Sequence, residues 1–186
     1  MIKSHLKFFI LIFSFFILLA ACGRKPAEPV EAGPPPAVSS FTLKNLASEF
    51  PGEIKTAEYA GKVQLVIFLR TDDAACRGSL GDWNGLQKEF AARGFTLVGA
   101  VTDERPVDVV AAEVVALDIP WPIGLANAPV VEAFGGPAAI HAIPTAFLIG
   151  RDGFVARRYA GFVPLQTLRD DIVLALDGQP LPDPKP

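Results

Sequence analysis

The sequence predicts an α/β domain whose mixed β-sheet is covered by helices on both faces. Two almost continuous apolar runs, Val63–Leu69 and Phe95–Val101, have the length and composition of strands that are buried on both sides. A hairpin is predicted further along, where Thr145–Ile149 and Phe154–Tyr159 flank the turn residues Arg151-Asp152-Gly153. Strands that alternate with helices and end in a hairpin indicate a mixed sheet between helical layers.

The helices of this domain are predicted from apolar spacing and from the residues at their ends. A helix is predicted over residues 73–93, because Leu80, Trp83 and Phe90 fall on one face together with either Leu86 or Gln87. Gly94 ends this helix. A second helix begins at Pro106 and stops before Pro120. Pro129–Phe134 suits a short helix, and a last helix is expected from about Pro164 to Leu176. These elements place one domain at residues 41–178.

Composition limits the function classes open to the chain. It has 186 residues, of which 51% are hydrophobic and 20% charged, and its formal net charge is −3. This composition excludes an intrinsically disordered protein, and the acidic balance gives no reason to expect nucleic acid as a partner. One domain of ordinary size, with appendages at its ends, fits this length.

The N-terminal appendage has the pattern of an export signal. Phe8–Ala21 is apolar except for Ser14 and follows Lys3 and Lys7, which is too short for a confident membrane span but typical of a secretory signal. It ends in Leu19-Ala20-Ala21-Cys22, which resembles the cleavage motif of bacterial lipoproteins, in which the cysteine is acylated. An ordinary signal peptide that happens to end next to a cysteine is the alternative.

The lipoprotein interpretation predicts residues 1–21 as the signal peptide and Cys22 as the lipid anchor in a bilayer. Gly23 is not the Asp that resembles an inner-membrane retention signal. We therefore expect a periplasm-facing protein of the bacterial envelope, at the outer rather than the inner membrane. Residues 22–40 form a proline-rich tether, and residues 179–186, with four prolines, are expected to form a disordered tail.

The number of cysteines argues against an intramolecular disulfide and against a cysteine-based zinc site. If Cys22 carries lipid, Cys76 is the only free thiol, and the domain has no partner for an intramolecular disulfide. One cysteine and the single remaining histidine, His141, do not supply the four ligands of a zinc site. No metal and no cofactor are predicted.

Four local segments, together with the element order, show a family resemblance. The segments are Phe41-Thr-Leu-Lys-Asn-Leu46, Gly61-Lys-Val-Gln-Leu-Val-Ile-Phe68, Gly94-Phe-Thr-Leu-Val-Gly99 and Ile143-Pro-Thr-Ala-Phe-Leu-Ile-Gly-Arg-Asp-Gly153. They resemble the thioredoxin fold, and in particular the membrane-tethered redoxins of the TlpA and ResA type, which are related to the AhpC/TSA peroxidases. The resemblance implies thiol–disulfide oxidoreduction as the family activity, and it implies that the Ile143–Pro144 bond is cis and faces the active site.

The sequence departs from this family at the site itself. The family places Cys-x-x-Cys at the start of the helix that follows the first buried strand, where the first thiol attacks a disulfide and the second resolves the intermediate. Here the corresponding residues are Asp73-Ala-Ala-Cys76, so Asp73 stands in place of the attacking cysteine. Because a carboxylate does not exchange disulfides, the two-thiol cycle is not available within one molecule.

Each residue near this motif has a structural and a chemical interpretation. Asp73 is expected to cap the helix, with a catalytic acid or base role as the alternative. Cys76 is either a buried packing residue or a thiol that forms mixed disulfides or reduces peroxide by a one-cysteine route. Thr71 stands five residues before Cys76, whereas the peroxidase pattern places its threonine three before the attacking cysteine. His141 is a surface loop residue or a base near Cys76.

Three functions remain open at this point. The first is a lipid-anchored redoxin that works at most through Cys76, on envelope proteins or their thiols. The second is a non-catalytic module that holds an extended peptide of a partner protein in the groove beside Pro144. The third is a structural lipoprotein of the envelope, which only the anchor and tether support. Whether the protein is an enzyme is left open by the sequence.

Overall fold

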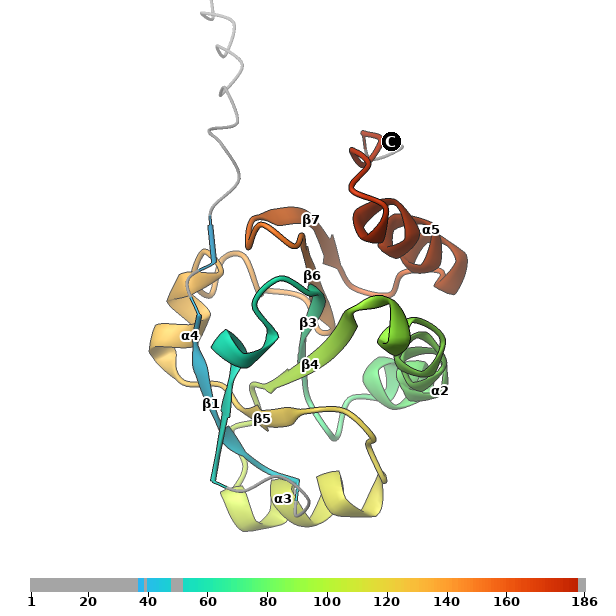
Figure 1. Cartoon of the computed structure of the whole chain (residues 1–186). Helices are drawn as coiled ribbons and strands as arrows, with labels where there is room; N and C mark the ends of the chain where they lie inside the picture. Colours follow the sequence, from blue (N-terminus) through green and yellow to red (C-terminus); the bar gives the residue numbers. More distant parts are fainter. Residues whose placement is uncertain (1–36, 39, 48–51, 184–186) are drawn as a thin grey trace, which may run out of the picture. The chain divides into compact units, whose positions relative to one another are not determined.

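The computed structural model describes residues 37–38, 40–47 and 52–183, and these form one sheet with helices on both of its faces (Figure 1). The predicted signal peptide and Cys22 lie outside the described residues. The strands are β1 (Thr42–Asn45), β2 (Glu53–Lys55), β3 (Val63–Leu69), β4 (Phe95–Val101), β5 (Ile123–Leu125), β6 (Thr145–Ile149) and β7 (Val155–Ala160). The helices are α2 (Ala74–Phe90), α3 (Val107–Ala116), α4 (Ala128–Ala133) and α5 (Leu165–Leu176), with short 3₁₀ segments at Thr56–Tyr59 and Ala91–Arg93.

The seven strands lie in the order β2-β1-β5-β4-β3-β6-β7. β3 runs parallel to β4, and β4 runs parallel to β5, whereas every other neighbouring pair is antiparallel. The predicted mixed sheet is therefore confirmed, and so are the two buried strands and the hairpin. β1 and β2 extend the sheet beyond the elements that the apolar pattern indicated.

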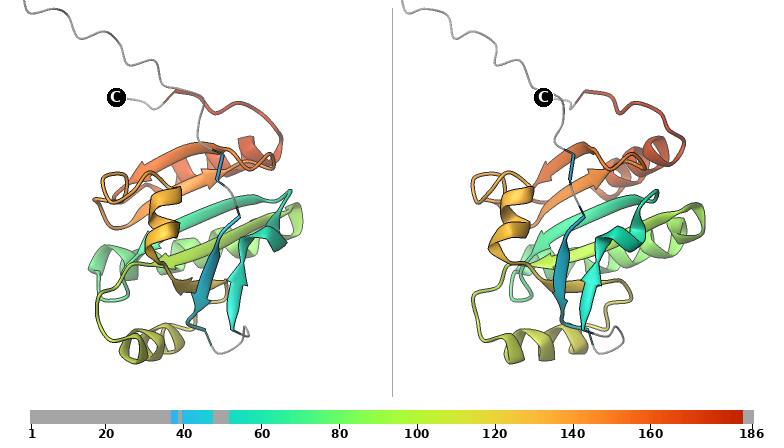
Figure 2. Two further views of the ribbon diagram at one scale, coloured as in Figure 1. Left: turned by 90° about the vertical axis from the view of Figure 1, so that its left-hand side faces the viewer. Right: turned by 60° about the vertical axis from the view of Figure 1, so that its left-hand side comes forward.

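The central strand β3 explains why its sequence is apolar at nearly every position. Leu65, Ile67 and Leu69 face one hydrophobic core, which α2, α3 and α5 cover. Val66 and Phe68 face a second core, which α4 and the aromatic ring of Phe134 cover. All seven residues of β3 are buried, as expected for a strand between two helical layers (Figure 2).

The ends of the domain differ from the sequence expectation. Ala37 and Val38, expected in the tether, contact the β6–β7 turn, where the Val38 amide donates to the Gly153 carbonyl over 3.1 Å. Residues 179–183, expected in a disordered tail, lie against the domain. Leu181 packs on the core beneath α5, and the Pro182 carbonyl accepts a hydrogen bond from Arg157. Apolar and carbonyl contacts of this kind are not visible in a proline-rich composition.

Candidate functional site

The candidate site lies where β3 and β4 end and α2 begins. Four residues, Arg70–Asp73, connect β3 to α2, and the carboxyl ends of the parallel strands bring residues 102–105 beside them. The loop before β6 carries the Ile143–Pro144 peptide bond, which is cis as the resemblance implied. The Pro144 carbonyl accepts from the Gly161 amide over 2.8 Å, so the segment after β7 lies next to it.

Asp73 is the N-cap residue of α2. Its Oδ1 accepts a hydrogen bond from the Cys76 amide over 2.9 Å, and its backbone is extended, as capping requires. A carboxylate at this position also interacts favourably with the positive end of a 17-residue helix. The capping interpretation is confirmed. Nothing in the geometry adds an acid or base function, because the carboxylate is already occupied by the helix.

Cys76 is buried in the first turn of α2. Only 2% of the residue is exposed, and it belongs to the core that α2 shares with β3 and α5. Burial is the main cause that raises the pKa of the thiol to about 12, and the neighbouring Asp73 and Asp72 carboxylates contribute to this rise. The Arg70 backbone amide acts in the opposite direction but is the smaller effect. In this conformation Cys76 is a protonated thiol without access to solvent, which is the opposite of an activated nucleophile.

The pH dependence of stability should reveal this buried thiol. The folded-state pKa of Cys76 lies above the value of about 8.5 for a free thiol, so the folded protein holds this proton more tightly than the unfolded chain. The resulting stabilisation is fully present below about pH 8.5 and is lost as the pH rises toward 12. We expect the free energy of unfolding, measured with urea, to fall more steeply above pH 9 in the wild type than in Cys76→Ser. Parallel curves for the two proteins would contradict the buried, protonated thiol.

Thr71 has a role that its spacing to Cys76 did not indicate. It is buried, and its Oγ1 lies 2.7 Å from Glu113 Oε2, 2.8 Å from Arg105 Nη2 and 3.2 Å from Asp103 Oδ2. We call these four residues, Thr71, Asp103, Arg105 and Glu113, the Arg105 cluster. The sequence contained one signal for it, since polar residues follow both parallel strands directly and therefore meet at one edge of the sheet.

The other candidates have ordinary structural roles. His141 is exposed, and its Nδ1 lies 2.8 Å from the Ala138 carbonyl. Trp121 is fully buried, with Nε1 donating to Asn84 Oδ1 over 2.8 Å, and Trp83 is buried in the same core, so both tryptophans contribute to packing. Among the described residues, no group of three or more His, Cys, Asp or Glu side chains is arranged to hold a metal ion.

The surface beside Pro144 is formed by the loop before β6 and by the segment after β7. A cavity of about 20 Å³ lies under it, which is room for no more than a water molecule. Within the described part of the chain, neither the N–H nor the C=O of Ile143 has a hydrogen-bond partner, although Ile143 is only partly exposed. Phe162 follows Gly161 directly and is 67% exposed. The site therefore offers one residue with unpaired backbone groups, Ile143, and an exposed aromatic ring on the segment that hydrogen-bonds to Pro144.

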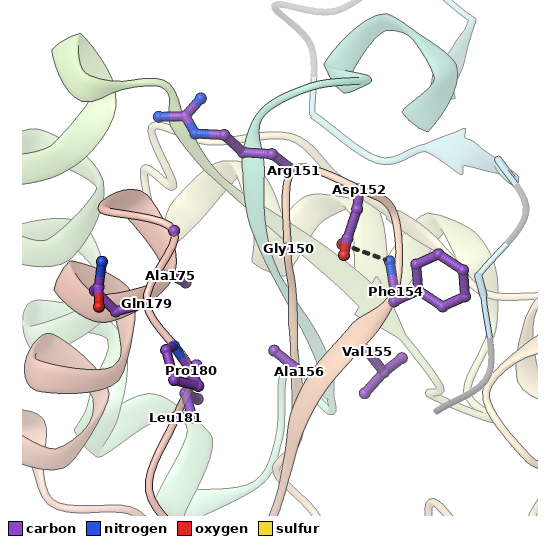
Figure 3. Close-up of a pocket in the computed structure, with 11 residues that line it drawn as sticks. Gly150, Arg151, Asp152, Phe154, Val155, Ala156, Ala175, Gln179, Pro180 and Leu181 are labelled. Carbon is purple, nitrogen blue, oxygen red and sulfur yellow. Dashed lines mark hydrogen bonds between the residues drawn. The ribbon is translucent and has the colours of Figure 1, made fainter. Parts of the chain in front are cut away.

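Larger cavities lie elsewhere. One of about 570 Å³ is open to solvent and is lined by the β6–β7 turn, β7 and the end of α5 with the segment after it (Figure 3). Asp152 and Phe154 stand at its rim, where the Asp152 carboxylate accepts from the Phe154 amide over 3.1 Å. None of the residues that line it belongs to the α2 N-terminus or to the Pro144 loop. No helix in the described ranges is both long and apolar enough to cross a membrane.

Comparison with solved structures shows the same fold in several thiol–disulfide proteins. A thiol:disulfide interchange protein of the thioredoxin family from Chlorobium tepidum TLS is 29% identical, covers 78% of this chain and 99% of its own, and has a TM-score of 0.66. The exposed lipoprotein thioredoxin Etrx1 of Streptococcus pneumoniae strain TIGR4 is 18% identical, with 73% and 98% covered and a TM-score of 0.60. A secreted thiol-disulfide isomerase from Corynebacterium glutamicum is 18% identical, with 75% and 85% covered and a TM-score of 0.65.

The family model that matches the sequence agrees with these structures. Comparison with curated protein sequences gave no match. The AhpC/TSA family model matches residues 36–158, which include β3, the start of α2 and the Pro144 loop. With the thioredoxin-like fold and the interchange proteins that share it, thiol–disulfide oxidoreduction is the type of activity found in this family. The chain belongs to the AhpC/TSA family and is a thioredoxin-like redoxin of the TlpA and ResA type.

Proposed function

We propose that this protein is an envelope-anchored redoxin that binds an extended segment of a partner protein beside Pro144 without exchanging disulfides. The observation that carries the proposal is the unpaired backbone of Ile143. An extended peptide placed there gains backbone hydrogen bonds in the manner of an added strand, and these need no thiol. Phe162, which is exposed and follows the residue that hydrogen-bonds to Pro144, is available for an apolar contact with such a peptide.

The state of Cys76 supports binding over catalysis. Disulfide exchange requires a thiolate within reach of a substrate sulfur, and Cys76 is buried and protonated. One-cysteine chemistry, by mixed disulfides or peroxide reduction, would require the Arg70–Asp73 loop to move away first. The position that would hold an exposed thiol in the family holds the capping carboxylate of Asp73 instead.

The location of the protein is part of the proposal. Acylation of Cys22 after the Leu19-Ala-Ala motif would anchor the domain to the envelope membrane, with the tether between them. The pneumococcal protein of the same fold is described as an exposed lipoprotein, which is compatible with such an anchor. On the Gly23 argument the anchor is placed in the outer membrane, and the bound partner is an envelope protein.

Site-specific crosslinking in cells tests this function. We expect a photoreactive phenylalanine analogue at position 162 of the full chain to crosslink one discrete partner in the membrane fraction. The analogue at Val115 is the matched control, because Val115 is 54% exposed and lies on α3, away from Pro144. The adduct should persist unchanged in Cys76→Ser, since backbone hydrogen bonds do not depend on the thiol.

Three outcomes would contradict the proposal. Equal crosslinking from positions 162 and 115 would show that the surface beside Pro144 has no preference for a partner. Loss of the adduct in Cys76→Ser, or its recovery as a mixed disulfide of Cys76, would establish one-cysteine chemistry instead. Absence of any adduct from position 162 in folded, membrane-bound protein would leave the protein as a structural lipoprotein.

A further inference from the structure

The Arg105 cluster joins three separate segments at the edge of the sheet. Arg105 binds Asp103 through Nε and Nη2 over 2.9 and 2.6 Å, and it binds Glu113 through Nη1 and Nη2 over 3.0 and 2.8 Å. Its Nη2 also lies 2.8 Å from Thr71 Oγ1. The arginine therefore connects the loop after β4 and helix α3 to the loop after β3. A planar guanidinium is suited to such paired contacts with two carboxylates.

The cluster is buried on the side that faces the β3–α2 loop. The Asp103 side chain is fully buried and Thr71 is 1% exposed, whereas Arg105 and Glu113 are partly exposed. Hydrogen bonds from Arg105 hold the pKa of the Asp103 carboxyl far below its usual range and lower that of Glu113 to about 2. Both carboxylates remain charged at physiological pH, so the contacts to Arg105 are maintained.

The Arg70–Asp73 loop, whose Arg70 amide contacts the Cys76 thiol, is attached to the domain through this cluster. Its four residues, Arg70–Asp73, include no large apolar side chain that could hold it in the core. Arg70 and Asp72 pair with each other at the surface over 3.0 Å, which gives little stabilisation, and Asp72 Oδ2 also lies 3.7 Å from Arg105 Nε. Thr71 is the buried member of the loop, and its hydroxyl contacts only Asp103, Arg105 and Glu113 among the described residues.

Helix α2 is tied to the same point. Arg77, which follows Cys76 in the helix, donates from Nε to the Thr71 carbonyl over 2.6 Å. The Arg70 amide interacts with the Cys76 thiol. We propose that the Arg105 cluster is a latch that holds the Arg70–Asp73 loop over Cys76 and keeps the thiol inaccessible. Disruption of the cluster opens the loop and exposes the thiol while the rest of the fold persists.

Thiol accessibility measures the latch directly. The full chain is treated with N-ethylmaleimide at pH 7.5, and labelling is followed by peptide mass spectrometry so that Cys76 is separated from Cys22. We expect Arg105→Gln to increase the labelling rate at Cys76 at least tenfold. Arg93→Gln is the matched control, because Arg93 forms an exposed ion pair with Asp177 at 2.7 Å and lies beyond the far end of α2. It should leave the rate unchanged.

A second variant keeps the test valid if Arg105→Gln does not fold. Thr71→Val removes the buried hydroxyl contact between the loop and the cluster, and it leaves Arg105 paired with Asp103, Glu113 and Asp72. It should also increase labelling at Cys76 severalfold, with a melting temperature close to that of the wild type. Wild-type labelling rates in folded Thr71→Val, or an equal increase in Arg93→Gln, would overturn the latch.

The latch and the proposed binding function fail in different experiments. Labelling of Cys76 reports the position of the Arg70–Asp73 loop and does not depend on any partner. Crosslinking from position 162 reports contact at the Pro144 loop and does not depend on the thiol. In the oxidising compartment that the proposed location implies, a closed latch would also keep Cys76 from forming disulfides with other proteins.

Discussion

Asp73→Cys is expected to convert this protein into an active thiol–disulfide oxidoreductase. The substitution restores two cysteines three residues apart, with the new thiol at the N-terminus of α2. There the helix dipole lowers the pKa of a thiol, which makes it a nucleophile near neutral pH. In dithiothreitol-driven reduction of insulin, we expect the wild type to match the uncatalysed rate and the variant to exceed it at least tenfold.

The chemistry of the variant follows from the positions of the two thiols. The new thiolate attacks an insulin disulfide, forms a mixed disulfide and releases one insulin thiolate. Cys76 then attacks the mixed disulfide, releases the second insulin thiolate and leaves a disulfide between positions 73 and 76, which dithiothreitol reduces. Burial of Cys76 is compatible with this second step, because its target is bound at the same helix turn.

One control and the stability of the variant make the result interpretable. Asp73→Ser keeps a capping oxygen without supplying a thiol, so it should remain at the uncatalysed rate. Asp73→Cys itself loses the carboxylate cap, which costs about 1 kcal/mol of stability, and should still fold. If the variant forms the disulfide between positions 73 and 76 but stays inactive, then the surroundings of the site, and not one residue, have departed from the family.

Much of the fold could be predicted because its signals are local. β3 and β4 are buried on both faces, so their sequences are apolar at nearly every position and indicate strands without further information. The helix at residue 73 could be placed because Asp is a good cap, and the structure confirms this contact. The hairpin was visible from its turn residues alone.

The parts that could not be predicted depend on contacts between distant segments. Whether Cys76 is inert or reactive depends on the loop above it, and that loop is held by Arg105 and Glu113, which come more than thirty residues later in the chain. Neither hydrophobic periodicity nor a local motif predicts a side-chain contact between segments so far apart in the sequence. The same applies to Leu181 and Pro182, whose attachment depends on α5 and on Arg157.

Asp171→Ala is expected to cause a large loss of stability. Asp171 is 4% exposed, and its Oδ2 accepts from Tyr159 Oη over 2.7 Å and from Arg157 Nη1 over 2.8 Å. Removing one member of a buried ion pair costs about 3–5 kcal/mol, because the remaining charge is left without a partner. For a domain of this size we expect the melting temperature to fall by roughly 10 °C, measured by circular dichroism.

The adjacent residue provides the matched control for this prediction. Asp170 is exposed and contacts only Gln166 among the described residues, so Asp170→Ala should change the free energy of unfolding by less than about 0.5 kcal/mol. Equal melting temperatures for the two variants would contradict a stabilising role of the buried pair. The double variant Arg157→Met/Asp171→Leu should recover most of the loss, since it removes both charges and fills the same space with apolar groups.

The consequence of Asp171→Ala should extend beyond α5. Arg157 binds both the Asp171 carboxylate and the Pro182 carbonyl, and Tyr159 lies on the same strand, β7. Without Asp171, the Arg157 guanidinium loses its buried partner and is expected to turn toward solvent. This movement would break its contact with the Pro182 carbonyl and release the segment after α5 from the edge of the sheet. Hydrogen exchange in β7 and residues 179–183 should therefore increase at temperatures where β3 and β4 remain protected. Uniform protection across the sheet would show that Asp171 stabilises the domain as a whole and does not hold this edge in place.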